Sequence, residues 1–348
     1  MTDAAPRYYA LALQTRCDAV NGLSHADTRE AMRAAICRVD EQVKAAKSFV
    51  GPHLKLVVLP EYFMTGYPIG ETIDGWANKA GIAAGGPEFQ MLGKVAAGHG
   101  VYLAANAYEC DDHFPGLYFQ TSFLLNPSGD TILRYRRLIS MFAPTPHDVW
   151  DRYLDIYGVD AVFPVADTEI GRLACCASEE ILFPEICRAH ALRGAEVILH
   201  STSENASPEL TPKDVAKRAR AIENIVYVVS ANSGGIYGTG MPSSSVDGMS
   251  KIVDHRGLVL TASASGESMV ANAEIDLGAL RAARRRPGMA NYLARQRLDI
   301  AAAAYGGRDI YPANTLLTDT GDAVVPQRSH FVETQRRAIE RLIDDELI

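Results

Sequence analysis

The sequence predicts an α/β fold in which β-sheets lie inside and helices cover them. Short apolar runs alternate along the chain with longer stretches whose apolar residues recur at helical spacing. The same rhythm appears in both halves, and each half contains a hairpin-type turn, over 126–130 and over 254–257. Two such βαβα-like halves are typical of a sandwich with its sheets at the centre.

The first half of the chain predicts helices that alternate with buried strands. Met32, Ile36 and Val39 recur at helical spacing within the helix expected over 27–49. The segment 56–59 is apolar at every position, which predicts a strand buried on both faces. The other elements expected here are a helix over 87–98 and strands over 8–14, 101–107, 118–125 and 131–138.

The second half repeats this pattern without a linker or low-complexity tract. Residues 1–300 are therefore expected to form one domain. Gly194 is the expected C-terminal cap of the first helix in this half. The expected elements are helices over 185–193 and 212–224 and strands over 173–177, 196–200, 225–231, 249–253 and 258–262.

Residues 301–348 are expected to form a C-terminal extension. An irregular stretch leads to 328–347, where Phe331, Ile339 and Leu342 recur at helical spacing. This terminal helix is expected to pack either on its own subunit or on a neighbouring copy at an oligomer interface. The sequence favours neither arrangement.

The composition excludes several kinds of partner. The chain has 348 residues, of which 47% are hydrophobic and 22% charged, as in ordinary globular proteins. Its net charge of −8 argues against binding to nucleic acid or to an anionic membrane. The basic cluster Arg281, Arg284, Arg285 and Arg286 is expected to be a solvated helix end.

The sequence also predicts a cytoplasmic protein. No apolar run reaches the roughly 18 residues that span a bilayer, and the first residues lack the features of a signal peptide. The 6 cysteines are too sparse for a disulfide scaffold and include no CxxC pair for zinc. They are expected to be reduced and mostly buried.

Three segments carry residues typical of a hydrolytic site. The first is Leu56-Val-Val-Leu-Pro-Glu61-Tyr-Phe, in which a carboxylate ends a buried strand. Desolvation raises the pKa of such a carboxyl, which would make Glu61 a useful general base. The alternative is a structural glutamate held by the backbone N–H groups of the following turn.

The second segment is Leu133-Arg-Tyr-Arg-Arg-Leu138, which follows one of the hairpin turns. Arg137 could hold an oxyanion or a substrate carboxylate, because a guanidinium is a planar fork of donors. It cannot release a proton within a protein, so it is a poor general acid. The alternative is an exposed arginine at the edge of a strand.

The third segment, 171–185, ends a small apolar strand at Ser178 and begins a helix near Phe183-Pro184-Glu185. A nucleophile on such a turn lies beside backbone N–H groups. Cys175 and Cys176 lie inside the strand, three and two residues before Ser178. A serine needs an adjacent base, which either Glu61 or a histidine could provide.

Two histidines are candidates for the site. His200 ends the strand expected beside the one before Ser178, so it is expected at the same edge of the sheet. Both a functional and a packed role remain open for it. His147 and the adjacent Asp148 are expected to line the pocket. Three loops are expected to determine the substrate. They are 62–70, which begins with Tyr62, 140–150 and 232–246.

The three segments together resemble the nitrilase (carbon–nitrogen hydrolase) superfamily. The usual family residues are glutamate, lysine and cysteine, and here the matching positions hold Glu61, Arg137 and Ser178. The resemblance runs from about residue 8 to residue 298 and includes the phrase Arg218-Ala-Arg-Ala-Ile-Glu-Asn224. It implies an αββα sandwich that assembles into a homodimer or a larger homo-oligomer.

The resemblance also implies a role for each residue. Glu61 would act as the base, Ser178 would be acylated, and Arg137 would stabilise the oxyanion. The backbone N–H of Glu179 would help to form the oxyanion hole, and Glu180 would orient the turn. Asp148 is the nearest candidate for a second acidic residue that the family often has.

The implied activity is hydrolysis of a small amide, nitrile or carbamoyl compound, with an amide favoured. Neither a metal nor an organic cofactor is implied, and the expected partners are a small-molecule substrate and further copies of the chain. The alternative is an inactive homologue that keeps a ligand-binding or assembly role. An engineered serine would explain Ser178 but not Arg137, so the two departures together favour natural divergence.

Overall fold

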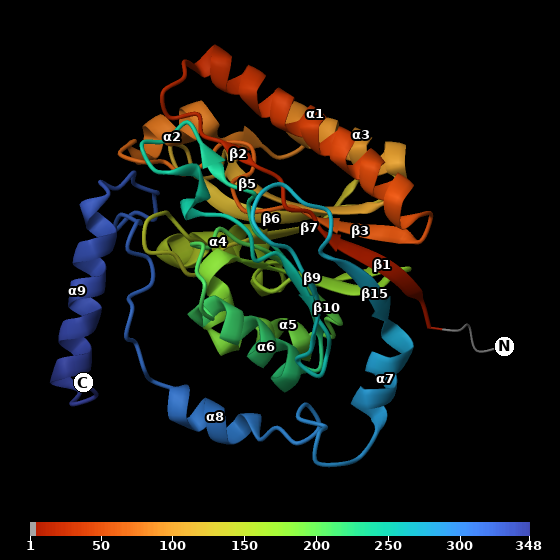
Figure 1. Cartoon of the computed structure of the whole chain (residues 1–348). Coiled ribbons are helices and arrows are strands. Elements are labelled where there is room, and N and C mark those ends of the chain that lie inside the picture. The colour runs from red at the N-terminus through yellow and green to blue at the C-terminus, as the bar shows by residue number, and fades with distance from the viewer. Residues whose placement is uncertain (1–4) are drawn as a thin grey trace.

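Two β-sheets lie face to face at the centre of the computed structural model, which describes residues 5–348 (Figure 1). The first sheet has the order β15 (Asn272–Asp276), β1 (Arg7–Ala12), β3 (Leu54–Val58), β5 (Tyr102–Cys110), β6 (Phe119–Leu125), β7 (Thr131–Arg136), with β4 (Ile82–Ala83) paired to β5. The second has the order β14 (Val259–Ala262), β13 (Lys251–Val253), β11 (Tyr227–Ala231), β10 (Val197–Ser201), β9 (Gly171–Ala177), β8 (Ala166–Thr168). A small separate sheet pairs β12 (Ile236–Tyr237) with β2 (Cys17–Asp18).

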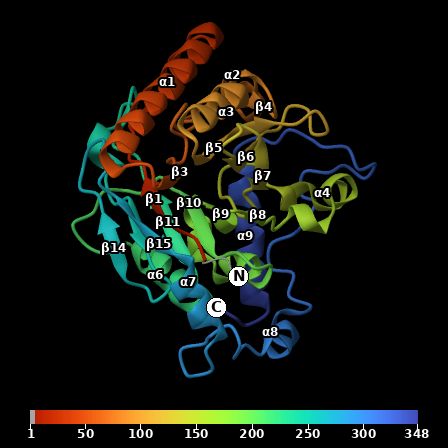
Figure 2. The ribbon, with the colours of Figure 1, turned by 90° about the vertical axis from the view of Figure 1, so that its right-hand side faces the viewer.

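Helices cover the outer face of each sheet. Helices α1 (His25–Val50) and α3 (Pro87–His99) pack on the first sheet, and α5 (Pro184–Leu192) and α6 (Pro212–Asn224) pack on the second. The turned view in Figure 2 shows α1 and α3 above the sheets and α6 below them. The predicted αββα sandwich is therefore confirmed. The remaining helices are α2 (Ile73–Ala80), α4 (Trp150–Tyr157), α7 (Leu277–Arg285), α8 (Leu298–Tyr305) and α9 (Ser329–Asp344).

Strand β3 shows why the sheets are buried on both faces. Leu56 and Val58 belong to the core between the two sheets, whereas Val57 and Leu59 belong to the core under α1 and α3. Successive side chains of a strand point to opposite faces, so the continuous apolar run fills both cores at once. Each fully buried aliphatic side chain contributes about 1.5–3 kcal/mol to the free energy of folding.

Helices α2, α4 and α8 were not expected from the sequence, and α8 lies where an irregular stretch was expected to begin. Each spans only 8 residues, which is about two turns and too short for a helical repeat of apolar residues to be recognised. Within residues 5–348, no helix is both long enough and apolar enough to cross a bilayer.

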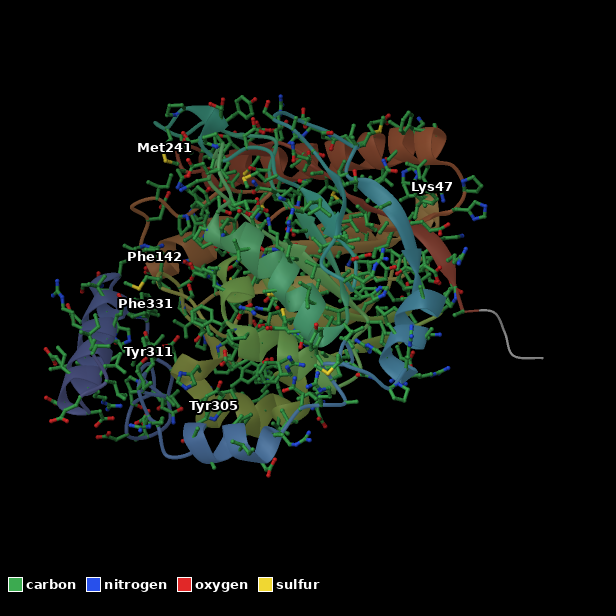
Figure 3. The ribbon with its side chains drawn as sticks, turned by 60° about the horizontal axis from the view of Figure 1, so that its bottom comes forward. Lys47, Phe142, Met241, Tyr305, Tyr311 and Phe331 are labelled. Atoms are coloured by element: carbon green, nitrogen blue, oxygen red, sulfur yellow. The ribbon has the colours of Figure 1, made fainter. Side chains whose placement is uncertain are left out.

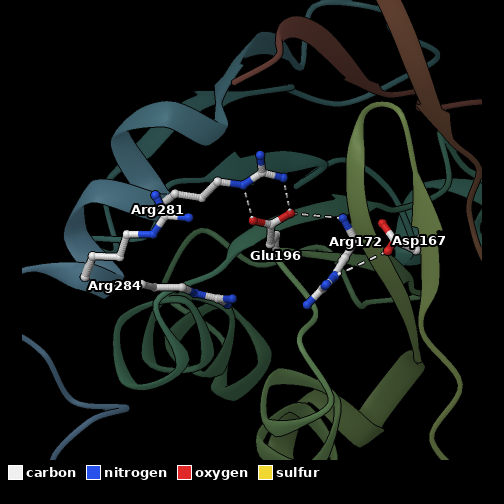
Figure 4. A pocket seen from close by; sticks show the side chains of 6 residues that line it. Asp167, Arg172, Glu196, Arg281 and Arg284 are labelled. Carbon is white, nitrogen blue, oxygen red and sulfur yellow. Dashed lines mark hydrogen bonds and ion pairs between the residues drawn. The ribbon is translucent and has the colours of Figure 1, made fainter. Parts of the chain in front are cut away.

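Four arginines near the end of α7 were expected to be solvated, and this prediction is wrong for Arg281 and Arg284. Arg281 binds both carboxylate oxygens of Glu196, at 2.6 and 2.9 Å (Figure 4). Arg284 donates to the backbone oxygens of Ala195 and Ile225, and burial lowers its pKa to about 10. These bonds attach α7 to the second sheet, because Ala195 and Glu196 lead directly into β10.

The C-terminal extension packs on its own subunit. Phe331 of α9 is only 1% exposed and lies in a cluster with Trp76 and Tyr118. The Arg328 side chain, just before α9, donates to the backbone oxygens of Glu71 at 2.5 Å and Phe142 at 2.9 Å. Figure 3 labels Phe142 and Phe331 near the start of α9. Assembly with a second copy stays a prediction.

Phe331→Ala is expected to loosen α9 from the body of the protein. Removing a buried phenylalanine side chain costs about 3–5 kcal/mol, and this contact is the main apolar anchor of the helix. Amide hydrogen exchange should therefore speed up over 329–344. Ile343→Ala is the matched control, because Ile343 is 55% exposed on the same helix. Unchanged exchange in Phe331→Ala would show that other contacts hold α9.

Candidate active site

The three main candidate residues lie together at one edge of the sandwich. Strands β3 and β7 run in the same direction in the first sheet, and Glu61 and Arg137 follow their carboxyl ends. Ser178 follows β9 in the second sheet. Together with Tyr62 and Glu179, these residues line one pocket of about 590 Å³. The structure therefore places five of the eight predicted site residues in one pocket.

Ser178 occupies a strained turn between a strand and a helix. Its φ is 54°, in the left-handed region that residues other than glycine seldom adopt. It begins a short 3₁₀ turn, Ser178–Leu182, and α5 starts at Pro184. This matches the expected elbow, in which strain lifts a reactive side chain beside backbone N–H groups.

Glu180 holds this turn against the first sheet. Its Oε1 accepts hydrogen bonds from the Tyr135 hydroxyl at 2.8 Å and from the Leu138 N–H at 2.7 Å. Its Oε2 accepts a bond from the Ala177 N–H at 3.1 Å. Burial raises the pKa of Glu180 to about 7, although Arg137 and these hydrogen bonds act in the opposite direction. The expected role of Glu180 in orienting the turn is confirmed.

His200 supports the turn from behind and does not reach the pocket. It is fully buried, and its β10 position pairs with Cys176 of β9. Its Nε2 lies 2.8 Å from the Ser178 carbonyl oxygen, and its Nδ1 lies 2.9 Å from the Ser230 hydroxyl. Burial, and then the charge of Lys217, hold the pKa of His200 well below its usual range.

The proton of the neutral His200 ring must lie on Nε2, because a carbonyl oxygen can only accept a hydrogen bond. Both ring nitrogens are then occupied, and neither is left for the Ser178 hydroxyl. Of the two roles that the sequence left open for His200, the structure shows the one of a packed, buried residue. Neither a serine–histidine pair nor a substrate contact by His200 is formed.

Glu61 has one occupied and one free carboxylate oxygen. Its Oε1 accepts a hydrogen bond from Gln120 Nε2 at 2.6 Å and lies 3.7 Å from Arg137 Nη1. Its Oε2 is buried and, among residues 5–348, has no hydrogen-bond partner. The turn N–H groups do not hold this carboxylate, so the structural alternative is wrong. A free buried oxygen that lines a pocket can accept a proton from a bound group.

Arg137 is a fixed cation and not an exposed strand-edge residue. It is 6% exposed, and it donates from Nε to the Ile139 carbonyl at 2.6 Å and from Nη1 to Gln120 Oε1 at 2.7 Å. Its Nη2 forms an ion pair with Glu179. Burial alone would lower the pKa of Arg137, but Tyr62 and the carboxylates of Glu179 and Glu61 raise it above its usual value. A guanidinium has five N–H bonds, and these contacts use three of them.

Tyrosines form another wall of the pocket. Tyr62 also has a left-handed backbone, with φ of 57°, and its ring stacks on Tyr108 with the ring centroids 4.9 Å apart. Tyr67 meets Tyr62 edge to face at 5.4 Å, and Tyr118 lines the same pocket. In the described part of the chain, no group of three or more His, Cys, Asp or Glu side chains is placed to hold a metal ion.

His147 and Asp148 do not line this pocket, so their expected placement is wrong. Asp148 accepts hydrogen bonds from the N–H and hydroxyl of Thr145, at 2.9 and 2.7 Å, and from the Thr315 hydroxyl at 2.9 Å. The loop folds into a 3₁₀ turn, Pro146–Val149, before α4. Asp148 therefore caps this turn and binds the C-terminal extension, and the His147 ring lies beside Tyr311 of that extension.

Two charged pocket residues, Lys213 and Arg328, were missed by the sequence analysis. Lys213, in the first turn of α6, places Nζ 3.0 Å from the Ser203 carbonyl, 3.3 Å from the Thr202 hydroxyl and 3.5 Å from Ser178 Oγ. Arg328 reaches the pocket from the C-terminal extension. The position of Lys213 could have been inferred, because a helix that follows β10 begins at the same sheet edge. No local signal points to Arg328.

Known proteins resemble this chain in sequence and in fold. The sequence model of the family described as carbon-nitrogen hydrolase matches residues 24–285. A probable nitrilase of Schizosaccharomyces pombe is 26% identical over 253 residues, which cover 71% of this chain and 86% of that protein. A 2-oxoglutaramate amidase of Bacillus subtilis is 30% identical over 240 residues, which cover 68% and 85%.

Solved structures share the fold. The crystal structure of a carbon-nitrogen hydrolase from Helicobacter pylori matches with a TM-score of 0.64 at 20% identity, covering 87% of this chain and 99% of that chain. An amidase from Nesterenkonia sp. matches with a TM-score of 0.58 at 18% identity, covering 87% and 98%. At these identities the likeness is one of fold.

The raised pKa of Glu180 predicts a pH dependence of stability. The folded pKa of about 7 lies above the ordinary value of 4.5, so the folded state binds a proton that the unfolded chain releases between these values. Stability should therefore fall as the pH rises from 4.5 to 7, by about 1.4 kcal/mol for each unit by which the two pKa values differ.

Urea denaturation of the wild type and of Glu180→Gln at pH 5 and pH 8 measures this contribution. The variant should be less stable at both pH values, because its amide N–H₂ faces backbone donors, and its stability should change less with pH. Glu30→Gln, at an exposed position of α1, is the control and should keep the wild-type slope. An identical slope in Glu180→Gln would assign the pH dependence to other groups.

Proposed function

Because this chain belongs to the carbon–nitrogen hydrolase family, we propose that it cleaves a non-peptide C–N bond of a small molecule through Ser178. The observation that carries this proposal is the convergence of Glu61, Arg137 and Ser178 in one pocket. The strained backbone of Ser178 supports it, since such strain is typical of an exposed nucleophile.

Each residue has a defined task in the proposed reaction. Glu61 accepts the proton of Ser178 on its free oxygen, and Ser178 attacks the carbonyl carbon of the substrate. The negative charge that develops on the carbonyl oxygen is stabilised by Arg137 and by the backbone N–H of Glu179. Water then hydrolyses the acyl-serine and releases the acid. These steps need neither a metal nor an organic cofactor.

An amide is the favoured substrate class within this proposal. The related proteins include the 2-oxoglutaramate amidase and the amidase named above, and a nitrile or carbamoyl compound is the remaining choice. The pocket walls combine tyrosine rings with fixed charges, which suits a small, partly polar molecule. The rival proposal is a homologue that binds a ligand without turning it over, because both the usual cysteine and the usual lysine are replaced.

A substrate panel with mass detection separates these proposals. The protein is incubated with small amides, nitriles, esters and N-carbamoyl compounds, and its intact mass is measured. Hydrolysis should produce an acyl adduct on Ser178 that is absent in Ser178→Ala, whose turnover should fall by a factor of about 10³ or more. Ser48→Ala, an exposed serine on α1, should behave like the wild type. Binding without an adduct or turnover across the panel would reject the hydrolase.

The double variant Ser178→Cys with Arg137→Lys restores the usual pair of residues. An active wild type with a less active double variant would show that the chain has adapted to serine chemistry, in keeping with the bonds that fix Arg137. Activity only in the double variant would identify the native protein as an inactive homologue that keeps the fold of the family.

A further inference from the structure

We propose that Lys213 is a catalytic residue that donates a proton to the leaving nitrogen. This inference rests on the proposed hydrolysis at Ser178 and adds a residue to it. Expulsion of an amine from a tetrahedral intermediate needs a general acid, because an unprotonated amide nitrogen is a poor leaving group. The residue at the usual lysine position, Arg137, cannot lose a proton.

The contacts of Lys213 place its ammonium beside the reacting atoms. Its Nζ lies 3.5 Å from Ser178 Oγ, and it is the only side-chain partner of that hydroxyl among residues 5–348. The other two contacts of Nζ are the Ser203 carbonyl at 3.0 Å and the Thr202 hydroxyl at 3.3 Å. A protonated lysine has three N–H donors, and these three oxygens match that number.

The start of α6 is fixed by buried charges, so Lys213 is held at the pocket. The Thr211 hydroxyl caps the helix by accepting a hydrogen bond from the Asp214 N–H at 3.1 Å. Asp214 is buried in an ion pair with Lys251, and the fully buried Lys217 binds Glu204 at 2.7 Å. Removing one partner of such a pair leaves an uncompensated buried charge, so these bonds resist movement of the helix start.

Other ionisable groups near Ser178 have different tasks. His200 is neutral, and both of its ring nitrogens are occupied. The Glu180 carboxylate accepts bonds from Tyr135 and from backbone N–H groups behind the turn. Glu61 holds the proton taken from the serine. Besides Glu61, whose proton returns to Ser178 Oγ in the last step, the Lys213 ammonium is the remaining proton donor beside the Ser178 hydroxyl.

The proposed steps balance for a primary amide. Ser178 Oγ bonds to the carbonyl carbon as its proton moves to Glu61, and the carbonyl electron pair moves to oxygen. The C–N bond then breaks, the nitrogen takes a proton from Lys213, and ammonia leaves as the carbonyl re-forms. Water attacks the acyl-serine and gives one proton to the Lys213 amine. Ser178 Oγ leaves with the proton of Glu61, which regenerates all three groups.

The test compares two leaving groups on the same acyl group. The substrates are an amide turned over by the wild type and the 4-nitrophenyl ester of the same acid, whose phenolate leaves without a proton. Acylation is measured in a single turnover, by ammonia release for the amide and by the burst of 4-nitrophenolate for the ester. Lys213→Met should slow acylation by the amide by roughly 10²–10⁴-fold and acylation by the ester by less than about tenfold.

Lys213→Arg separates charge from proton transfer. It keeps the positive charge but cannot give up a proton, so it should lose amide acylation as Lys213→Met does and keep acylation by the ester. Lys94→Met, an exposed lysine on α3, is the control and should match the wild type with both substrates. Thermal unfolding of each variant confirms that it is folded.

The outcomes distinguish this inference from the proposed function. A wild type that turns over no compound of the substrate panel rejects the hydrolase itself, before Lys213 is tested. A wild type that is acylated by both, with a Lys213→Met variant that slows both equally, rejects the proton donor and leaves the hydrolase intact. Full amide activity in Lys213→Arg also rejects it, because charge alone would then suffice. Selective loss of amide acylation in both variants supports it.

Discussion

The hydrogen bonds of Glu180 join the two halves of the candidate active site. Ser178 belongs to the second sheet, whereas Glu61 and Arg137 belong to the first, and Glu180 bonds to Ala177 on one side and to Leu138 on the other. A buried carboxylate that lost these donors would be strongly destabilising, so the two sheet edges must keep their spacing. The Glu180 side chain, together with the ion pair between Arg137 and Glu179, therefore helps to set the distances between Ser178, Glu61 and Arg137.

Arg137 shows how a change of residue alters the task at a position. Its guanidinium contacts Ile139, Gln120 and Glu179 at the same time, which a single ammonium on a flexible stem would not do with the same geometry. The fork thus organises the carboxylates around the pocket as well as carrying charge. In the proposed hydrolysis, this fixed guanidinium supplies a permanent charge, and the protons that move come from other groups.

The sequence predicted those features that follow from strands and failed where loops decide. The run 56–59 identified a strand buried on both faces, and Glu61, Arg137 and Ser178 were recognisable because each follows a strand. His147 was misplaced because its loop folds into a 3₁₀ turn against the C-terminal extension. Lys213 was missed because the helix expected over 212–224 was not assigned to the site, although the order of the elements places its start at the same edge of the sheet.

Arg328 provides one wall of the pocket, and this has a consequence for biosynthesis. Residues near the end of the chain dock through Phe331 and complete a site whose other parts come from the sandwich. Because this segment is synthesised after the sandwich, a nascent chain exposes the pocket without this wall until Arg328 docks. Packing changes in α9 can therefore alter one pocket wall while Glu61, Arg137 and Ser178 keep their positions.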